Sequence, residues 1–352
     1  MTASAETLAH QILEDAIQAR VFPATTLEVG DARGPIWTAA LGTLSFDAGS
    51  PATALDTPFD LASLTKPIAT TSVMMQLAAA RVLALDDRVA RFFAEWRGDD
   101  REAVTVGDLL EHASGLPARL VDAPPETRRE FEHEICAIRL ESAPRAQSIY
   151  SDLGFLLLGF LAADAGGDLA TQFSSLRPDP MLAFALDPAA ARRAAPTLPM
   201  PKDPRRGRTL VGEVHDNYAA ALGGVAGHAG LFGTAAAVGA FARTMLRAAR
   251  GHAGGPAPFT PEQVARFTRR SLAGVPGSSR ALGWDTMLPT SSCGTRMSPA
   301  AFGHVGFTGT SLWIDPPRDR YVVLLTNRTC GGGTVEAMRD VRRAFHDAVG
   351  DL

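Results

Sequence analysis

The sequence predicts an α+β fold in which an antiparallel sheet is built from both chain ends and flanked by helices, with a mostly helical region inserted. Two observations lead to this prediction. Strand-like runs occur near both ends of the 352-residue chain, and helical runs fill the segment between them. We therefore expect a single unit, with a sheet part over approximately residues 1–62 and 281–352 and a helical part over approximately residues 63–280.

The N-terminal elements follow from simple residue patterns. Residues 5–20 alternate acidic and apolar side chains, as an amphipathic helix does. Residues 26–31 and 36–42 have the composition of strands, and Gly30 and Pro35 supply the turn between them. Helices are expected next over residues 64–81, 85–96, 106–112, 147–165, 234–250 and 260–270.

The later part of the chain changes character. Residues 176–216 are rich in Pro, Arg and Ala and show weak periodicity, which predicts a long irregular insertion over the core. Thr234 is expected to cap the helix that follows it. Asp315-Pro316-Pro317 predicts a turn between the last two strands. The expected C-terminal strands cover 281–287, 303–314 and 321–327, and a final helix covers 334–349.

Composition and charge exclude several classes of function. The formal charge of -4 and the pI near 6.1 give no electrostatic reason to expect a nucleic-acid partner. No apolar run reaches the roughly 18–20 residues of a membrane span, and the N-terminus lacks the pattern of a secretory signal. The three cysteines are widely spaced and predict neither a disulfide framework nor a zinc site. We expect a cytoplasmic protein without a cofactor or metal, and its oligomeric state stays open.

The rarity of lysine draws attention to one motif. Only Lys66 and Lys202 are lysines among the 34 basic residues, so arginine is used wherever positive charge alone is needed. Lys66 lies three residues after Ser63, which places both side chains on one face of a helix. A serine hydroxyl needs a nearby base, and burial can lower the pKa of a lysine enough to make it one. The alternative is a capped helix start with a surface lysine.

Two further stretches have the residue types that such a nucleophile needs. Tyr150 and Asp152 stand at the start of the apolar helix, and a tyrosine near an ammonium group can pass a proton between serine and leaving group. His304 and Gly306 lie in a glycine-rich strand that also supplies Phe307, whose N–H is expected to assist the Ser63 N–H in holding an oxyanion. We expect His304 to offer a donor or partial positive charge at the rim. Packing alone is the alternative for both stretches.

Other constellations carry weaker signals. His215, Asp216 and His228 are candidate metal ligands, although such residues more often brace a loop. The glycine-rich stretch at 223–233 lacks the Gly-Lys-Ser/Thr ending of a phosphate loop. The chain has no His-Glu-x-x-His zinc motif and no Gly-x-Ser-x-Gly elbow, which argues against a zinc protease and an α/β-hydrolase.

The order of these motifs resembles the penicillin-recognising serine hydrolases, which include class C β-lactamases, D-alanyl carboxypeptidases, D-aminopeptidases and esterases. The family pattern is Ser-x-x-Lys, Tyr-x-Asn and Lys/His-x-Gly. It corresponds here to Ser63–Lys66, Tyr150–Asp152 and His304–Gly306. The stretches DLASLTKP, LLEHASGLP, GHAGLFGTA and GHVGFTGTSLWIDP also resemble the family, and the likeness spans most of residues 55–327. It implies a β-lactamase/transpeptidase-like fold.

The resemblance implies an acyl-enzyme mechanism with Ser63 as nucleophile and neutral Lys66 and Tyr150 as the acid–base pair. Asp152, His304, Gly306 and Phe307 would then contact the substrate. Asp152 replaces the usual Asn, and His304 replaces the lysine of true β-lactamases, which shifts the expected substrate toward small esters, amides or peptides, including peptidoglycan fragments and D-amino-acid peptides. The alternatives are a β-lactamase or D-alanyl carboxypeptidase proper and a non-turnover sensor.

Overall fold

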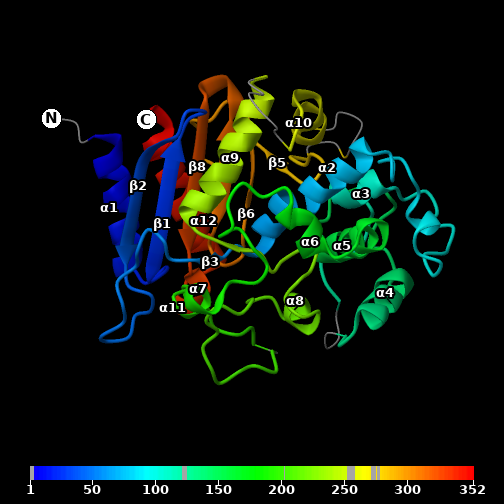
Figure 1. The fold of residues 1–352 in the computed structure, drawn as a ribbon, viewed down its shortest axis with the longest axis horizontal. Coiled ribbons are helices and arrows are strands. Elements are labelled where there is room, and N and C mark those ends of the chain that lie inside the picture. Colours follow the sequence, from blue (N-terminus) through cyan, green and yellow to red (C-terminus); the bar gives the residue numbers. More distant parts are fainter. Residues whose placement is uncertain (1–3, 121–124, 202, 252–257, 271–274, 276–277) are drawn as a thin grey trace.

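The structure is a computed structural model that describes residues 4–352 except 121–124, 202, 252–257, 271–274 and 276–277 (Figure 1). Its main sheet contains β1 (Ala24–Gly30), β2 (Pro35–Gly42), β5 (Asp285–Thr286), β6 (Phe302–Val305), β7 (Ser311–Asp315) and β8 (Arg320–Thr326). The strand order is β2-β1-β8-β7-β6-β5, and every neighbouring pair is antiparallel. Strands from both chain ends thus form one sheet, which confirms the predicted α+β class.

The first and last long helices cover one face of this sheet. Helices α1 (Ala5–Gln18) and α12 (Val335–Ala348) pack against each other and share a buried apolar cluster with Leu27 and Val29 of β1. Side chains alternate between the two faces of a strand, so Glu28 of the same strand points to the opposite face.

Helix α9 (Ala235–Ala249) covers that opposite face and contacts β1, β7 and β8. The Arg243 Nη1 and Tyr321 Oη groups both donate to the buried Glu28 Oε1, each at 2.7 Å. A Cβ atom at Gly239 would lie 1.9 Å from the same Glu28 oxygen, so glycine is what lets the helix approach. The predicted helical part, residues 63–280, therefore contributes one helix to the sheet layer.

The helical part lies beside the sheet and is centred on α5 (Asp152–Gly166) (Figure 1). All ten residues from Leu153 to Ala162 are buried, as expected for a helix that is apolar all round. No described helix is long and apolar enough to cross a membrane. The other helices are α2 (Ser72–Ala79), α3 (Val106–Leu110), α4 (Arg128–Ala137), α6 (Leu169–Ser174), α7 (Pro188–Arg192), α8 (Asn217–Ala221), α10 (Pro261–Thr268) and α11 (Arg328–Gly331).

Two predicted elements were wrong, and a third is much shorter than predicted. The strand expected over residues 281–287 covers only Asp285–Thr286, which is β5. Residues 303–314 do not form one strand but the hairpin of β6 and β7, because the Gly306 N–H bonds the Thr310 carbonyl and closes a turn that includes Gly309 at φ +108°. The helix expected over residues 85–96 is reduced to the 3₁₀ turn Val89–Arg91, because the Val89 N–H bonds a carbonyl outside the segment instead of continuing a helix.

Candidate active site

Ser63 lies in a tight turn that the preceding residues hold in place. The turn is the 3₁₀ segment Ala62–Leu64, which follows the short strand β3 (Phe59–Asp60) paired with β4 (Phe232–Gly233). Ala62 has a φ of +47°, a left-handed conformation that costs energy for a residue with a Cβ atom. The buried Asp60 Oδ1 accepts the Ala62 N–H at 2.8 Å and so stabilises this turn.

The Lys66 ammonium group is buried and surrounded by acceptors. Its Nζ donates to Ser63 Oγ at 3.1 Å, to Asp152 Oδ1 at 2.7 Å and to the His228 carbonyl at 3.3 Å. Three acceptors match the three N–H groups of an ammonium ion. Burial disfavours the charge, but Asp152 and Tyr150 outweigh burial and raise the pKa of Lys66 above its ordinary value. The expectation of a neutral resting Lys66 is therefore wrong, because the carboxylate beside it stabilises the cation.

Tyr150 stands just before α5, between two cations. The Lys66 Nζ lies 4.7 Å from the centroid of its ring, and the guanidinium carbon of Arg280 lies 5.0 Å from the same centroid. The His304 ring is 5.8 Å away, centroid to centroid. The structure thus brings Ser63, Lys66, Tyr150 and His304 together, as the sequence motifs predict.

Asp152 belongs to a charged network. Its Oδ2 accepts from Arg119 Nη1 at 2.8 Å, and the same nitrogen donates to Asp216 Oδ2 at 2.8 Å. Burial raises the pKa of Asp152, but the Lys66 ammonium and the Arg119 guanidinium outweigh burial and hold it below its ordinary value. Both carboxylate oxygens are therefore engaged by protein cations. Asp152 also lines the cavity into which Ser63 opens, so its contact with the substrate stays a prediction.

Asp152, Asp216 and His228 are close enough together to be considered as metal ligands, since one ligand atom from each lies within 4.8 Å of the others. His228 Nε2 is 2.8 Å from Asp216 Oδ1, and Lys66 and Arg119 already contact the two carboxylates. A metal ion would have to compete with both of these cations. The donor set therefore fits an internal ion-pair network better than a metal centre, and His215 is not part of it.

His304 is buried on β6, and its ring is oriented by its neighbour. Its Nδ1 lies 2.8 Å from the Val305 carbonyl, which can only accept, so Nδ1 carries the proton and Nε2 is the free acceptor. Burial and the cations of Arg280 and Lys66 lower the pKa of His304 well below its ordinary value. The ring is therefore a neutral group whose Nε2 is an acceptor, and not the donor or partial positive charge that the sequence predicts.

The turn after β6 presents a free amide. The Gly306 N–H is used by the Thr310 carbonyl, and the Gly306 carbonyl accepts from Arg342 Nη2 at 2.7 Å. In a trans peptide the next N–H, that of Phe307, points away from this carbonyl. Within the described chain, neither the Phe307 nor the Ser63 amide donates a hydrogen bond. These are the two N–H groups that we had expected to bind an oxyanion.

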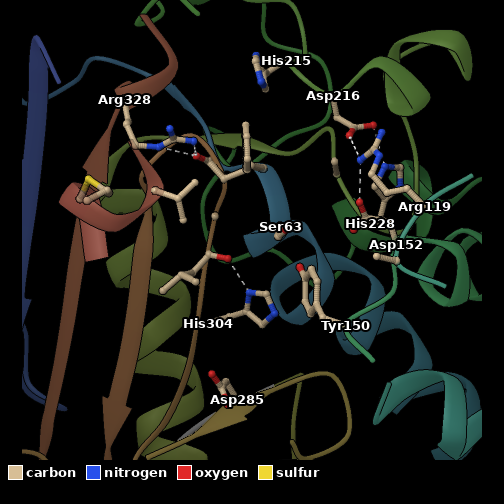
Figure 2. Close-up of a pocket in the computed structure, with 18 of the residues that line it drawn as sticks. Ser63, Arg119, Tyr150, Asp152, His215, Asp216, His228, Asp285, His304 and Arg328 are labelled. Carbon is tan, nitrogen blue, oxygen red and sulfur yellow. Dashed lines mark hydrogen bonds and ion pairs between the residues drawn. The ribbon is translucent and has the colours of Figure 1, made fainter. Parts of the chain in front are cut away.

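Ser63 opens into a cavity of about 410 Å³, a size that suits a small organic ligand. Figure 2 shows Ser63 between Tyr150 and His304 on one side and His215 on the other. Sequence reasoning missed all four arginines that line the cavity, because none of them belongs to one of the recognised motifs. They are Arg119, Arg280, Arg328 and Arg342.

Comparisons with known proteins agree with this geometry. The family model described as Beta-lactamase matches residues 9–346. A protein of Escherichia coli K12 named "Putative D-alanyl-D-alanine carboxypeptidase" is 32% identical over 309 residues, covering 77% of this chain and 69% of that protein.

Solved structures share the fold. EstCE1, a hydrolase with promiscuous acyltransferase activity, matches with a TM-score of 0.75 at 19% identity over 98% of both chains. A penicillin-binding protein homologue from Caulobacter crescentus matches with a TM-score of 0.73 at 19% identity over 99% of both chains. Together with the family match, these findings confirm the resemblance seen in the motifs. The chain belongs to the β-lactamase family and is a serine hydrolase.

Proposed function

We propose that this enzyme cleaves a small ester, amide or peptide through an acyl-enzyme on Ser63. The observation that carries the proposal is the Lys66 Nζ to Ser63 Oγ hydrogen bond of 3.1 Å at the wall of a cavity that also holds Tyr150. A serine with a positioned hydrogen-bond partner and nearby amide donors has the parts that acyl transfer requires.

The reactive form of the enzyme is the one in which the Tyr150–Lys66 pair has lost one proton to solvent. In the first step, Ser63 Oγ attacks the carbonyl carbon and its proton passes to the Tyr150 oxygen. Lys66 is already an ammonium ion and cannot accept that proton. It stabilises the developing charge on Ser63 and the phenolate, since both anions are favoured by a nearby cation. The Ser63 and Phe307 amides hold the oxyanion, a type of interaction worth about 3 kcal/mol for each donor.

In the second step, the Tyr150 phenol returns the proton to the leaving group, and the bond from the carbonyl carbon to that group breaks. Water then attacks the acyl carbon while Tyr150 takes one of its protons. The bond from that carbon to Ser63 Oγ breaks and Tyr150 passes the proton to Oγ, which releases the acid and restores Ser63. The order of proton transfers keeps Lys66 and Asp152 paired throughout.

Arg280 supports a substrate whose leaving group carries a carboxylate. Its guanidinium lines the cavity beside Tyr150 and has no hydrogen bond or ion pair with the residues that the structure describes. Arg280, which comes from a different segment of the chain, can thus provide the positive charge that the neutral His304 does not. Together with the name of the Escherichia coli relative, this favours a D-amino-acid peptide over a simple alkyl ester.

Turnover measurements test the proposal. The enzyme is incubated with nitrophenyl esters, acyl-D-alanyl-D-alanine peptides and a fluorescent penicillin, and both product release and intact mass are followed. We expect steady hydrolysis with a transient acyl adduct that maps to the peptide containing Ser63. A lasting adduct without turnover would instead indicate a sensor, and efficient hydrolysis confined to a β-lactam would indicate a β-lactamase proper.

A further inference from the structure

His215 is a buried imidazole at the cavity wall with no internal hydrogen bond. Its side chain lines the cavity, and the residue is only 4% exposed. Neither Nδ1 nor Nε2 has a partner in the described part of the chain. Buried polar groups in folded proteins are almost always hydrogen-bonded, so an imidazole left unpaired at a cavity points to a partner that arrives with the ligand.

The position of this ring is tied to the nucleophile turn. The backbone N–H of His215 donates to Asp60 Oδ2 at 2.6 Å, while Asp60 Oδ1 accepts the backbone N–H of Ala62. The imidazole stacks on the Phe307 ring, with centroids 5.7 Å apart and an interplanar angle of 17°. Phe307 is 50% exposed, and its amide is one of the two free N–H groups. The Asp60 carboxylate thus fixes the backbone of His215 relative to Ala62, the residue before Ser63.

The chemistry of the ring limits what it can bind. Burial lowers the pKa of His215 to about 4, so the imidazole is neutral at pH 7 and offers one donor and one acceptor. The neighbouring Arg328 directs three of its five N–H groups to backbone carbonyls. Its Nε and Nη2 donate to the Phe307 carbonyl, and its Nη1 donates to the Gly333 carbonyl. A neutral group that has both an acceptor and a donor, such as an amide, matches the two unpartnered ring nitrogens of this imidazole.

The side of the cavity indicates which part of the substrate is involved. Tyr150 and Arg280 lie together, and we assign both to the leaving group. His215 lies on the other side of Ser63 from Tyr150 (Figure 2). The acyl part of the substrate therefore extends toward His215 and Phe307.

We propose that His215 and Phe307 form a subsite for the acyl part of the substrate, in which the imidazole hydrogen-bonds an amide group and the phenyl ring covers the adjacent apolar carbons. This inference rests on the acyl-transfer function proposed above and assigns to that site a preference for N-acylated amino-acid substrates.

Three phenyl esters of similar size test the subsite. Phenyl N-acetylglycinate carries the amide, phenyl 4-oxopentanoate keeps only its carbonyl, and phenyl pentanoate has neither polar group. With wild-type enzyme we expect kcat/KM to be about tenfold higher for the N-acetylglycinate than for the pentanoate after correction for spontaneous hydrolysis, with the 4-oxopentanoate between them. In His215→Phe, which keeps the ring stack, the three values should converge. His215→Gln, which keeps a donor and an acceptor, should retain part of the preference.

The outcomes separate this subsite from the proposed function. Equal kcat/KM values in wild-type enzyme, or a uniform loss for all three esters in His215→Phe with no change in their ratio, would overturn the amide subsite and leave acyl transfer intact. The same esters are also titrated calorimetrically onto Ser63→Ala and onto Ser63→Ala/His215→Phe. If Ser63→Ala binds the N-acetylglycinate more tightly than the other two esters, and Ser63→Ala/His215→Phe does not, the subsite is supported even if no ester is turned over. Equal binding of the three esters to Ser63→Ala counts against the subsite.

Discussion

The polar groups around the cavity fall into two sets that are built on opposite principles. We call these sets the saturated side and the open side, according to their hydrogen bonding and not their position relative to Ser63. On one side, the groups around Lys66 are saturated: the ammonium has three acceptors, and Asp152, Arg119 and Asp216 share a continuous ion-pair network. On the other side, the polar groups are left open. His304 Nε2 and both His215 nitrogens have no partner among the described residues.

This difference indicates that the saturated groups serve the reaction itself and that the open groups serve substrate recognition. A saturated network holds its charges at fixed positions, so little reorganisation is needed when the reaction begins. An unpaired buried group gains a hydrogen bond only when a ligand supplies it, and it penalises ligands that do not. We therefore expect substitutions on the saturated side to affect every substrate and substitutions on the open side to affect particular substrates.

The largest expected effect comes from the nucleophile. Ser63→Ala should lower kcat/KM by about 10⁴-fold or more for every substrate and abolish the acyl adduct. The exposed Ser174→Ala is a matched control and should behave like wild type. Ester turnover is measured together with intact mass, and a persistent adduct in Ser63→Ala would show that another residue is acylated.

A second prediction concerns Arg342, which holds the turn that presents the Phe307 amide. Its Nη2 donates to the Gly306 carbonyl at 2.7 Å and to the Thr310 carbonyl at 3.0 Å. Arg342→Met should lower kcat about 10²-fold for all substrates, because the oxyanion donor loses its support, and should change KM little.

Arg339→Met, on the same helix but exposed, is the control for Arg342. Steady-state kinetics are compared with thermal melting of each variant. A change in KM with kcat unaltered, or a fall in kcat that only parallels a fall in melting temperature, would contradict a role in positioning the oxyanion donor.

Asp152→Asn tests the saturated side through stability. The variant removes the carboxylate that neutralises buried Lys66, so we expect the free energy of unfolding at pH 7 to fall by about 1–3 kcal/mol. Despite burial, the folded-state pKa of Asp152 lies below its ordinary value of 3.8. Its contribution is therefore present above pH 3.8 and is lost as the pH falls toward the folded-state pKa.

Denaturant unfolding at pH 7 and pH 3 measures this prediction. The difference between wild type and Asp152→Asn should narrow at the lower pH. A difference that stays constant, or one that widens in acid, would show that the ionised carboxylate does not stabilise the fold.

The smallest effect is expected on the open side, at Arg280. Arg280→Met should reduce the preference for an acyl-D-alanyl-D-alanine peptide over the same peptide with a C-terminal amide by roughly tenfold, with little change in activity on neutral esters. The exposed Arg266→Met is the control. Peptide hydrolysis is measured by release of the last residue, and an equal loss on both peptides would argue against carboxylate recognition.

Local patterns were enough to predict much of the fold. Apolar periodicity and end signals placed α1, α9 and α12 within a few residues, and Thr234 caps α9 through the Ala237 N–H as predicted. Helix α4 was not predicted, although its capping box between Thr127 and Glu130 is visible in the sequence. The hairpin of β6 and β7 was read as one strand because its turn depends on a hydrogen bond that apolar patterning does not reveal.

For the site, the sequence by itself determined the residues to which we assign the chemistry. Ser63, Lys66, Tyr150 and His304 stood out through motif spacing and the scarcity of lysine. The tertiary structure decided the charge states of Lys66 and His304. Asp152 comes from a segment 86 positions away from Lys66, and its carboxylate keeps that lysine an ammonium ion. The protonation of a buried group depends on which charges surround it in space, and spacing along the chain does not contain that information.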